Sequence, residues 1–204
     1  MVSRRNIGLI ALATPFWFVT VYLILSSRHP EFSHLTKAVS ELGSLDAPDL
    51  WFWNVLGYIL PGIAIALLGL GLKREFSLTS RRFVVPALAL TASGLLMAMS
   101  GVFPGDFENR ASARMIFHTV GSVGSFVAFL VAGFWLPRAF RSIEEWRWLA
   151  WPSLTLVVAS ILAGFLRSGA APGLGQRVGF VLFFAWVAMV GYALLRSRST
   201  SSEA

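Results

Sequence analysis

The 204-residue sequence contains no cysteine, and it has only 10 acidic residues against 17 lysines and arginines. The absence of cysteine excludes disulfide bonds, zinc–thiolate centres, cysteine nucleophiles and thiol redox chemistry. Charged residues make up 13% of the chain, which is about half of what a soluble domain typically carries. The hydrophobic fraction of 56% is far too high for a disordered chain. Composition therefore indicates a membrane protein.

Six apolar runs are each long enough to cross a bilayer, which takes about 20 apolar residues. They cover residues 7–26, 51–72, 83–103, 115–136, 148–166 and 178–195. No small-x-small cleavage site follows the first run before Arg28, so we expect a retained span rather than a cleaved signal peptide. The sequence predicts an all-α, polytopic integral membrane protein. Residues 1–196 would form a single bundle of six transmembrane helices, and residues 197–204 a disordered cytoplasmic tail.

The basic residues are distributed unevenly between the connecting segments. If the N-terminus is cytoplasmic, the inner segments hold 11 of the 17 basic residues and net +7, whereas the outer segments net zero. This asymmetry predicts that both termini are cytoplasmic. The basic residues lie in short groups at the ends of apolar runs rather than along one polar face, which argues against nucleic-acid binding. The lipid bilayer is the expected partner, a lipid or small amphiphile is a candidate ligand, and the sequence leaves protein partners unknown.

The longest outer loop follows the first span and is expected to contain a short amphipathic helix. Pro30 suits the first turn of such a helix, and Gly43 suits its C-terminal cap. Apolar residues recur between them at helical spacing. His34, Lys37 and Glu41 lie on another face, where Lys37 and Glu41 form an i,i+4 pair. This helix would either seal the bundle as a lid or bring polar side chains over a pocket.

Three outer residues are candidates for catalysis. Asp106 follows the Pro–Gly break after the third span, and it either caps that turn, paired with Arg110, or points a carboxylate into the bundle. His118 is the only histidine inside a predicted span, where an ionisable group should face the bundle interior or a water-filled cavity. Ser40 lies on the predicted amphipathic helix and would donate a hydrogen bond. The candidate catalytic residues are therefore Asp106, His118 and Ser40.

Five further outer residues are candidates for substrate binding. Arg167 and Arg177 flank the Gly/Pro turn before the last span, and they either snorkel to lipid phosphates or hold an anionic substrate group. Ser122 shares a helical face with His118, a pattern that small residues at a helix–helix contact also produce. The candidate substrate-binding residues are Glu41, Arg177, Gln176, Ser122 and His34.

The sequence leaves the cofactor unknown. Transmembrane haem generally needs two axial ligands, and only one histidine lies in a span. Nucleotide binding is disfavoured because there is no Gly-rich loop followed by Lys-Ser/Thr. No metal site is predicted, although zinc remains an alternative with His118, Asp106 and His34 as ligands. Catalytic zinc uses about three protein ligands and one open position.

Two motifs and one histidine carry a resemblance to a known family. Ser40-Glu-Leu-Gly43, Gly101-Val-Phe-Pro-Gly-Asp106 and His118 resemble the prokaryotic membrane protein family called domain of unknown function 998. The resemblance covers nearly the whole chain. It implies six spans in a prokaryotic inner membrane and an outer Ser/Asp/His grouping, but no reaction. The sequence is more distantly similar to membrane hydrolases such as alkaline ceramidases and adiponectin-type receptors, which have seven spans and several histidines around zinc.

Three functions remain open at this point. The first is a small membrane enzyme that acts on a lipid or amphiphile at the outer Ser/Asp/His site. The second is a small-solute binding or transport protein, although most spans lack the mid-membrane carboxylates expected of a proton-coupled carrier. The third is a structural or accessory subunit, in which the outer polar residues only lock the loops onto the bundle.

Overall fold

The computed structural model describes residues 2–76, 80–166 and 171–197, and these residues are predominantly helical. The α-helices are α1 (Arg4–Arg28), α2 (Leu50–Trp53), α3 (Leu60–Phe76), α4 (Val84–Val102), α5 (Ala113–Phe140), α6 (Ala150–Phe165) and α7 (Pro172–Arg196). Short 3₁₀ helices are η1 (Val39–Gly43), η3 (Arg81–Phe83) and η4 (Glu144–Leu149). A π-helical segment, η2 (Asn54–Ile59), joins α2 to α3 in one continuous helix.

Six helices in the described residues are long and apolar enough to cross a membrane, which confirms the predicted fold class. They are Arg4–Arg28, Leu50–Phe76, Arg81–Val102, Ala113–Phe140, Glu144–Phe165 and Pro172–Arg196. Each predicted span coincides with one of these helices to within a few residues at either end. Of the tail predicted over residues 197–204, only Ser197 falls among the described residues, where its backbone N–H caps α7.

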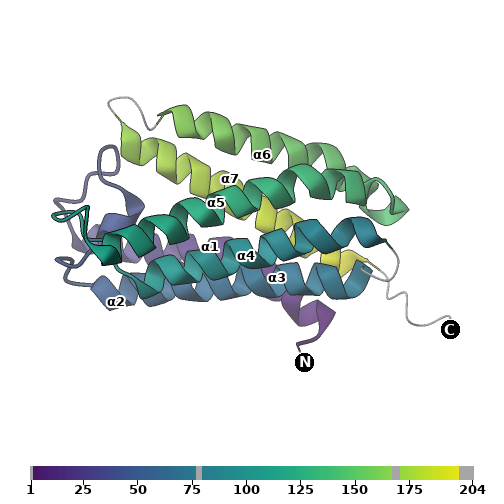
Figure 1. Ribbon diagram of the computed structural model, residues 1–204, viewed down its shortest axis with the longest axis horizontal. Helices are drawn as coiled ribbons and strands as arrows, with labels where there is room; N and C mark the ends of the chain where they lie inside the picture. The colour runs from purple at the N-terminus through teal and green to yellow at the C-terminus, as the bar shows by residue number, and fades with distance from the viewer. Residues whose placement is uncertain (1, 77–79, 167–170, 198–204) are drawn as a thin grey trace.

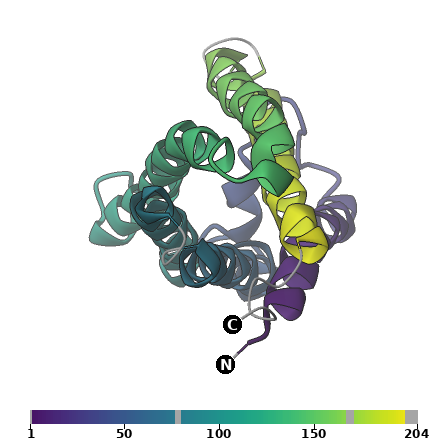
Figure 2. The same cartoon turned by 90° about the vertical axis from the view of Figure 1, so that its right-hand side faces the viewer.

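The long helices run side by side and form a ring (Figures 1 and 2). In Figure 2, α3, α4 and α5 make up one side of the ring, and α1, α7 and α6 make up the other. The ring closes because α1 packs on α3 and α6 packs on α5. The start of α1 and the end of α7 lie at one end of the bundle, called here the terminal end. The loops after α1 and α4 lie at the opposite end, which is the predicted outer side.

Small residues allow α3, α4 and α5 to pack closely. A Cβ atom built on Gly94 of α4 would lie 2.3 Å from the backbone nitrogen of Ala66 in α3. A Cβ atom on Gly121 of α5 would similarly lie 2.7 Å from the backbone nitrogen of Ser100. In a membrane, where lipid competes equally for apolar surface, such close contacts are a main source of helix association. The absence of a side chain at Gly121 therefore lets α4 and α5 approach closely.

The predicted amphipathic helix from Pro30 to Gly43 was wrong. Residues 30–38 form turns and irregular backbone, and only the five-residue 3₁₀ helix η1 forms at the end of this stretch. The physical reason is tertiary, because several backbone groups of the loop hydrogen-bond to side-chain and backbone groups of α7, and only isolated turns form within the loop. Gly173 N donates to Leu35 O (2.8 Å), Arg177 Nη1 donates to Lys37 O (2.8 Å), and Val39 N donates to Gln176 Oε1 (2.6 Å).

Two local features expected of that helix have different outcomes. The predicted pair of Lys37 and Glu41 is present, with 3.1 Å between the ammonium and the carboxylate. Glu41 also accepts a hydrogen bond from Ala38 N (2.7 Å), so its carboxylate caps η1. Gly43 is not a left-handed helix cap, because none of the described glycines has a positive φ. Its lack of a side chain serves close packing instead.

Candidate functional site

A cavity of about 400 Å³ lies near the opposite end of the bundle, between α4 and α5 on one side and α6 and α7 on the other. It is called here the outer cavity. Helices α5 and α6 meet farther toward the terminal end, where Gly133 contacts Val157. Much of the lining is apolar or aromatic, including Tyr58, Met97, Phe107, Phe126, Phe180 and Phe183. Its main polar lining residues are Ser40, Ser100, His118, Thr119, Ser122, Ser125, Ser160 and Gln176.

His118 projects from the first turns of α5 and is 4% exposed. Its Nδ1 lies 2.9 Å from both the Ser100 and Phe103 carbonyl oxygens, at the end of α4. Carbonyl oxygens only accept, so this network assigns the hydrogen to Nδ1, which donates to both. In the neutral ring Nε2 is then an acceptor. No described residue hydrogen-bonds to Nε2, which leaves it available to a molecule in the cavity.

The orientation of the His118 ring is held by its neighbours. The last carbonyls of an α-helix lack partners within the helix, and His118 satisfies two such groups at the end of α4. The rings of Tyr58 and Phe107 meet the imidazole edge-on, with centroids 6.2 and 6.4 Å from it. The imidazole is therefore fixed by hydrogen bonds on one edge and by aromatic packing beside it.

Ser40 and Gln176 bring further polar groups to the cavity from the first loop and from α7. Ser40 is 7% exposed, and among the described residues no partner hydrogen-bonds to its hydroxyl. The Gln176 carbonyl oxygen accepts from Val39 N, so its amide nitrogen is the group that can donate to a bound molecule. The Ser122 hydroxyl instead donates to Thr119 O (3.2 Å). The cavity thus combines a hydroxyl, an amide donor and an imidazole acceptor.

Asp106 does not line this cavity. Its Oδ1 accepts a hydrogen bond from Asn109 N (2.9 Å), which closes the turn after α4. It forms no hydrogen bond with His118, and the described residues include no ion pair between Asp106 and Arg110. Of the two roles considered for Asp106, the geometry matches the turn cap, without the predicted Arg110 pairing. The described residues therefore show no hydrogen bond that would join Asp106 to His118.

His34 and Arg177 belong to a different cluster, which fastens the first loop to α7. Arg177 Nε donates to the Tyr22 hydroxyl (2.6 Å). The Tyr22 hydroxyl also forms a hydrogen bond with Nδ1 of His34. The Arg177 guanidinium also lies 5.2 Å from the ring centre of Phe32. Arg167, the other predicted rim arginine, lies outside the described residues.

The structure therefore divides the eight candidate residues. Ser40, His118, Ser122 and Gln176 line the outer cavity, whereas Asp106, Glu41, His34 and Arg177 form contacts within or beneath the loops. Within the described part of the chain, no group of three His, Cys, Asp or Glu side chains is placed to hold a metal ion. The alternative zinc ligands His118, Asp106 and His34 are accordingly not assembled into one set.

Sequence reasoning missed several lining residues, of which Ser100 is the most informative. Ser100 touches His118 through its carbonyl and, at 3.4 Å, through its hydroxyl. A usable signal was present, because Ser93, Met97 and Ser100 recur at i, i+4 and i+7 and therefore share one face of α4. The Ser93 hydroxyl on that face donates to Ser125 O on α5 (2.8 Å).

The two sequence motifs meet at the junction of α2 and η2, beside the cavity. The Asn54 amide donates to Gly43 O (2.8 Å), and a Cβ atom on Gly43 would lie only 2.6 Å from Trp53 Cδ1. A Cβ atom on Gly101 would lie 2.7 Å from the Asn54 carbonyl oxygen. Leu45 N donates to Gly105 O (3.0 Å), which ties the two loops together. Both motifs are thus explained by packing that holds the loops at this end of the bundle.

In the part of the chain that the structure describes, six long apolar helices around an internal cavity define a polytopic α-helical membrane protein. The family model described as Protein of unknown function (DUF998) matches residues 12–193, so the chain belongs to this family and the resemblance seen in the sequence is confirmed. The matched range includes both motifs and every residue that lines the outer cavity. Comparisons with curated proteins and with solved structures gave no match.

Proposed function

We propose that this membrane protein binds an amphiphilic molecule in the outer cavity, with the polar group of that molecule beside His118, Ser40 and Gln176. One observation carries the proposal: Nε2 of His118 and the hydroxyl of Ser40 belong to buried residues that line the cavity, and neither atom has a hydrogen-bond partner among the described residues. Buried polar groups are nearly always hydrogen-bonded in folded proteins. A bound polar group would provide the missing partners.

The size and surroundings of the cavity suit a ligand with an apolar part. A volume of about 400 Å³ is within the range of small-molecule sites, which is about 300–1,000 Å³. Val123 and Phe126 line the cavity from α5 and are also exposed on the lipid-facing surface, at 56% and 37%. Gly164 lines it from α6 and is likewise exposed. The cavity therefore opens sideways between α5 and α6, where an acyl or isoprenoid chain would enter from the membrane.

The polar lining also restricts the ligand's polar group. Aspartate, glutamate, lysine and arginine are all missing from the described residues that line the cavity. Such a cavity favours an uncharged polar group, because a buried unpaired charge is costly. A hydroxyl or an amide would donate to His118 and accept from Ser40 or Gln176. The ligand class we propose is thus a lipid or amphiphile with an uncharged hydrogen-bonding group.

Filling the cavity tests this proposal. A Cβ atom on Gly179, which lines the cavity from α7, meets no atom within 4 Å. The Gly179→Leu substitution should therefore place a side chain in the cavity without a clash and displace the ligand. We expect native mass spectrometry of protein purified gently from membranes to show a bound amphiphile in the wild type, with several-fold lower occupancy in Gly179→Leu.

The matched control is Val181→Leu, on the exposed face of the same helix, where the wild-type side chain is 61% exposed. This variant should retain the ligand in full. The proposal is contradicted if the wild type carries no amphiphile, or if Gly179→Leu folds normally and retains as much ligand as Val181→Leu.

A second candidate function, a membrane enzyme acting on the same amphiphile, is favoured by the orientation of His118. A general base must be held with its free nitrogen directed at the substrate, and the two carbonyls on Nδ1 perform that orienting role here. The His118→Asn substitution separates the two functions. In an enzyme, this variant should accumulate a molecule whose mass differs from the one held by the wild type. A binding protein should hold the same molecule at lower occupancy.

A further inference from the structure

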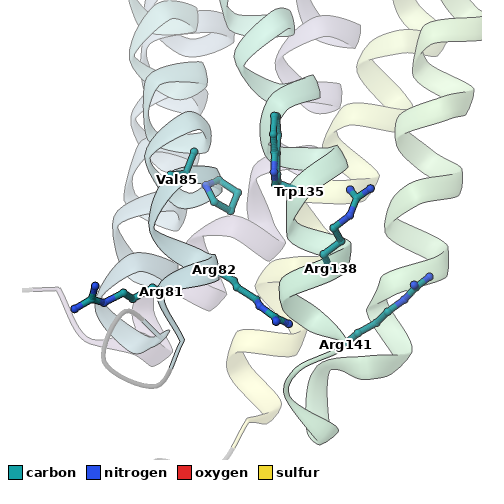
Figure 3. Close-up of a pocket in the computed structure, with 7 residues that line it drawn as sticks. Arg81, Arg82, Val85, Trp135, Arg138 and Arg141 are labelled. Atoms are coloured by element: carbon teal, nitrogen blue, oxygen red, sulfur yellow. The ribbon is translucent and has the colours of Figure 1, made fainter.

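A second cavity lies at the terminal end of the bundle, between the start of α4 and the end of α5 (Figure 3). Its volume is about 780 Å³, and it is called here the arginine cavity. It is lined by Arg81, Arg82, Val85, Pro86, Trp135, Arg138 and Arg141. Figure 3 shows Arg82 extending from the α4 side toward α5, whereas Arg81 is directed away from α5.

The arginine cavity concentrates positive charge without a compensating carboxylate. Across the described chain, no acidic group lies within 4.0 Å of the four arginines. Arg138 donates to the Phe134 carbonyl (3.2 Å), and Arg141 lies 4.9 Å from the ring centre of Trp151. Neither contact neutralises a charge. Guanidinium groups that line one cavity repel each other unless an anion occupies it.

Topology alone does not explain this arrangement. A positive-inside bias is satisfied by arginines anywhere on the terminal end, and Arg5 and Arg74 lie outside both the arginine cavity and the outer cavity. The arginines of the arginine cavity come instead from two segments far apart in sequence, and Arg82 extends toward the helix that carries Arg138. Planar guanidinium groups bind phosphate oxygens through paired hydrogen bonds, so the arrangement is suited to a phosphate.

The upper wall of the cavity indicates which phosphate compound fits. Val85 and Trp135 are 61% and 52% exposed, and they line the cavity above the arginines in Figure 3. Exposed apolar side chains on a membrane helix contact acyl chains, and tryptophan favours the headgroup layer. A free phosphate ion has no apolar part that could pack on Val85 and Trp135. Basic pockets between helices on the cytoplasmic side are sites for anionic lipid headgroups.

We propose that the arginine cavity binds an anionic phospholipid, whose phosphate lies among Arg82, Arg138 and Arg141 and whose acyl chains pack on Val85 and Trp135. This site is separate from the outer cavity, since the two share no lining residue. The two proposals can therefore fail independently. An anionic lipid bound here would link the start of α4 to the end of α5.

The test compares lipid binding by the wild type and by the double variant Arg82→Gln/Arg138→Gln. Each protein is delipidated in neutral detergent and titrated with phosphatidylglycerol or phosphatidylcholine, and complexes are counted by native mass spectrometry. We expect the wild type to prefer phosphatidylglycerol, and the double variant to bind it at least about tenfold more weakly, since each arginine contributes appreciably to anionic-lipid attraction. Phosphatidylcholine binding should not change.

The control is Arg5→Gln/Arg74→Gln, which removes the same charge from the same end outside the cavity and should retain the lipid preference. Arg82→Lys/Arg138→Lys keeps the charge but loses the planar donors, and intermediate binding is expected. The proposal is overturned if both Gln double variants lose binding equally, since the effect is then general electrostatics. It is also overturned if inorganic phosphate at millimolar concentration displaces the lipid completely, since the site is then one for a free anion.

Discussion

At the scale of single residues, His118 joins the packing of α4 to the chemistry of the outer cavity. Its Nδ1 edge completes the hydrogen bonding of two α4 carbonyls, and its Nε2 edge has no partner among the described residues. Asp106 has a local role by comparison, because its carboxylate accepts from a backbone N–H three residues along the chain. His118 and Asp106 look equivalent in the sequence, but His118 lines the cavity whereas Asp106 closes a turn.

This difference leads to a paired prediction for His118→Asn and Asp106→Asn. In His118→Asn, the new side-chain amide can still donate to the α4 carbonyls but offers no acceptor at the Nε2 position, so we expect near-normal thermal stability. Losing one buried hydrogen bond costs about 1 kcal/mol, which corresponds to an about fivefold loss of bound amphiphile. Asp106→Asn keeps the oxygen that accepts from Asn109, and ligand occupancy should remain unchanged. Native mass spectrometry and a melting curve measure both effects.

The opposite result would contradict the assignment of the binding site to the outer cavity. If Asp106→Asn removes the ligand while His118→Asn leaves it bound, then Asp106 contacts the ligand and the outer cavity is not the binding site.

At the scale of elements, the loops at the opposite end are shaped by contacts with distant helices. The loop after α1 bonds to α7 and does not form its own helix, although its apolar spacing is helical. The Ser40–Gly43 motif packs on the α2–η2 junction, where only the absence of a side chain at Gly43 leaves room for Trp53 and Asn54. Both partners are fully buried, at 0% and 1% exposure, so they have little space to move.

We therefore expect Gly43→Ala to destabilise the protein. The added methyl group would meet Trp53 Cδ1 at 2.6 Å and Asn54 Nδ2 at 2.7 Å, and overpacking of this kind typically costs about 1–3 kcal/mol. Gly179→Ala is the matched control, because its methyl group meets nothing within 4 Å and alanine favours the helix by up to about 1 kcal/mol. Melting curves in detergent should show a lower Tm for Gly43→Ala only. Equal Tm values for the two variants would contradict the packing explanation.

At the scale of the whole molecule, the two ends of the bundle differ in charge and in the kind of cavity they hold. The terminal end carries the arginine cavity, and the opposite end carries the largely uncharged outer cavity. The charge bias predicts that the terminal end faces the cytoplasm. In that orientation the arginine cavity would face the leaflet surface that is rich in anionic lipid.

The absence of cysteine from the chain makes this orientation directly measurable. Glu108→Cys introduces a thiol at an exposed position on the opposite end, and Glu145→Cys does so on the terminal end. A membrane-impermeant maleimide applied to intact cells should label Glu108→Cys and should label Glu145→Cys only after permeabilisation. The reverse pattern would show that the termini face outward, and it would place the arginine cavity on the other leaflet.

The sequence alone predicted the six spans and the family, and it identified four side chains that line the outer cavity. It did not predict that Asp106 would close a turn outside the cavity lining, nor that Arg177 would hold the first loop through Tyr22. It also treated Arg82 and Arg138 only as topology signals, whereas the structure brings both to one cavity. The last two of these missed features depend on contacts between residues that are far apart in the sequence.

What the sequence determined by itself was the number, length and approximate ends of the helices. A backbone in the bilayer must satisfy its own hydrogen bonds, so an apolar run of sufficient length forms a helix whatever its neighbours are. Only the tertiary structure decided the conformation of the first loop, the partners of His118 and the two cavities. These depend on contacts between segments far apart in the chain, where close packing at small residues and hydrogen bonds to other helices outweigh local spacing.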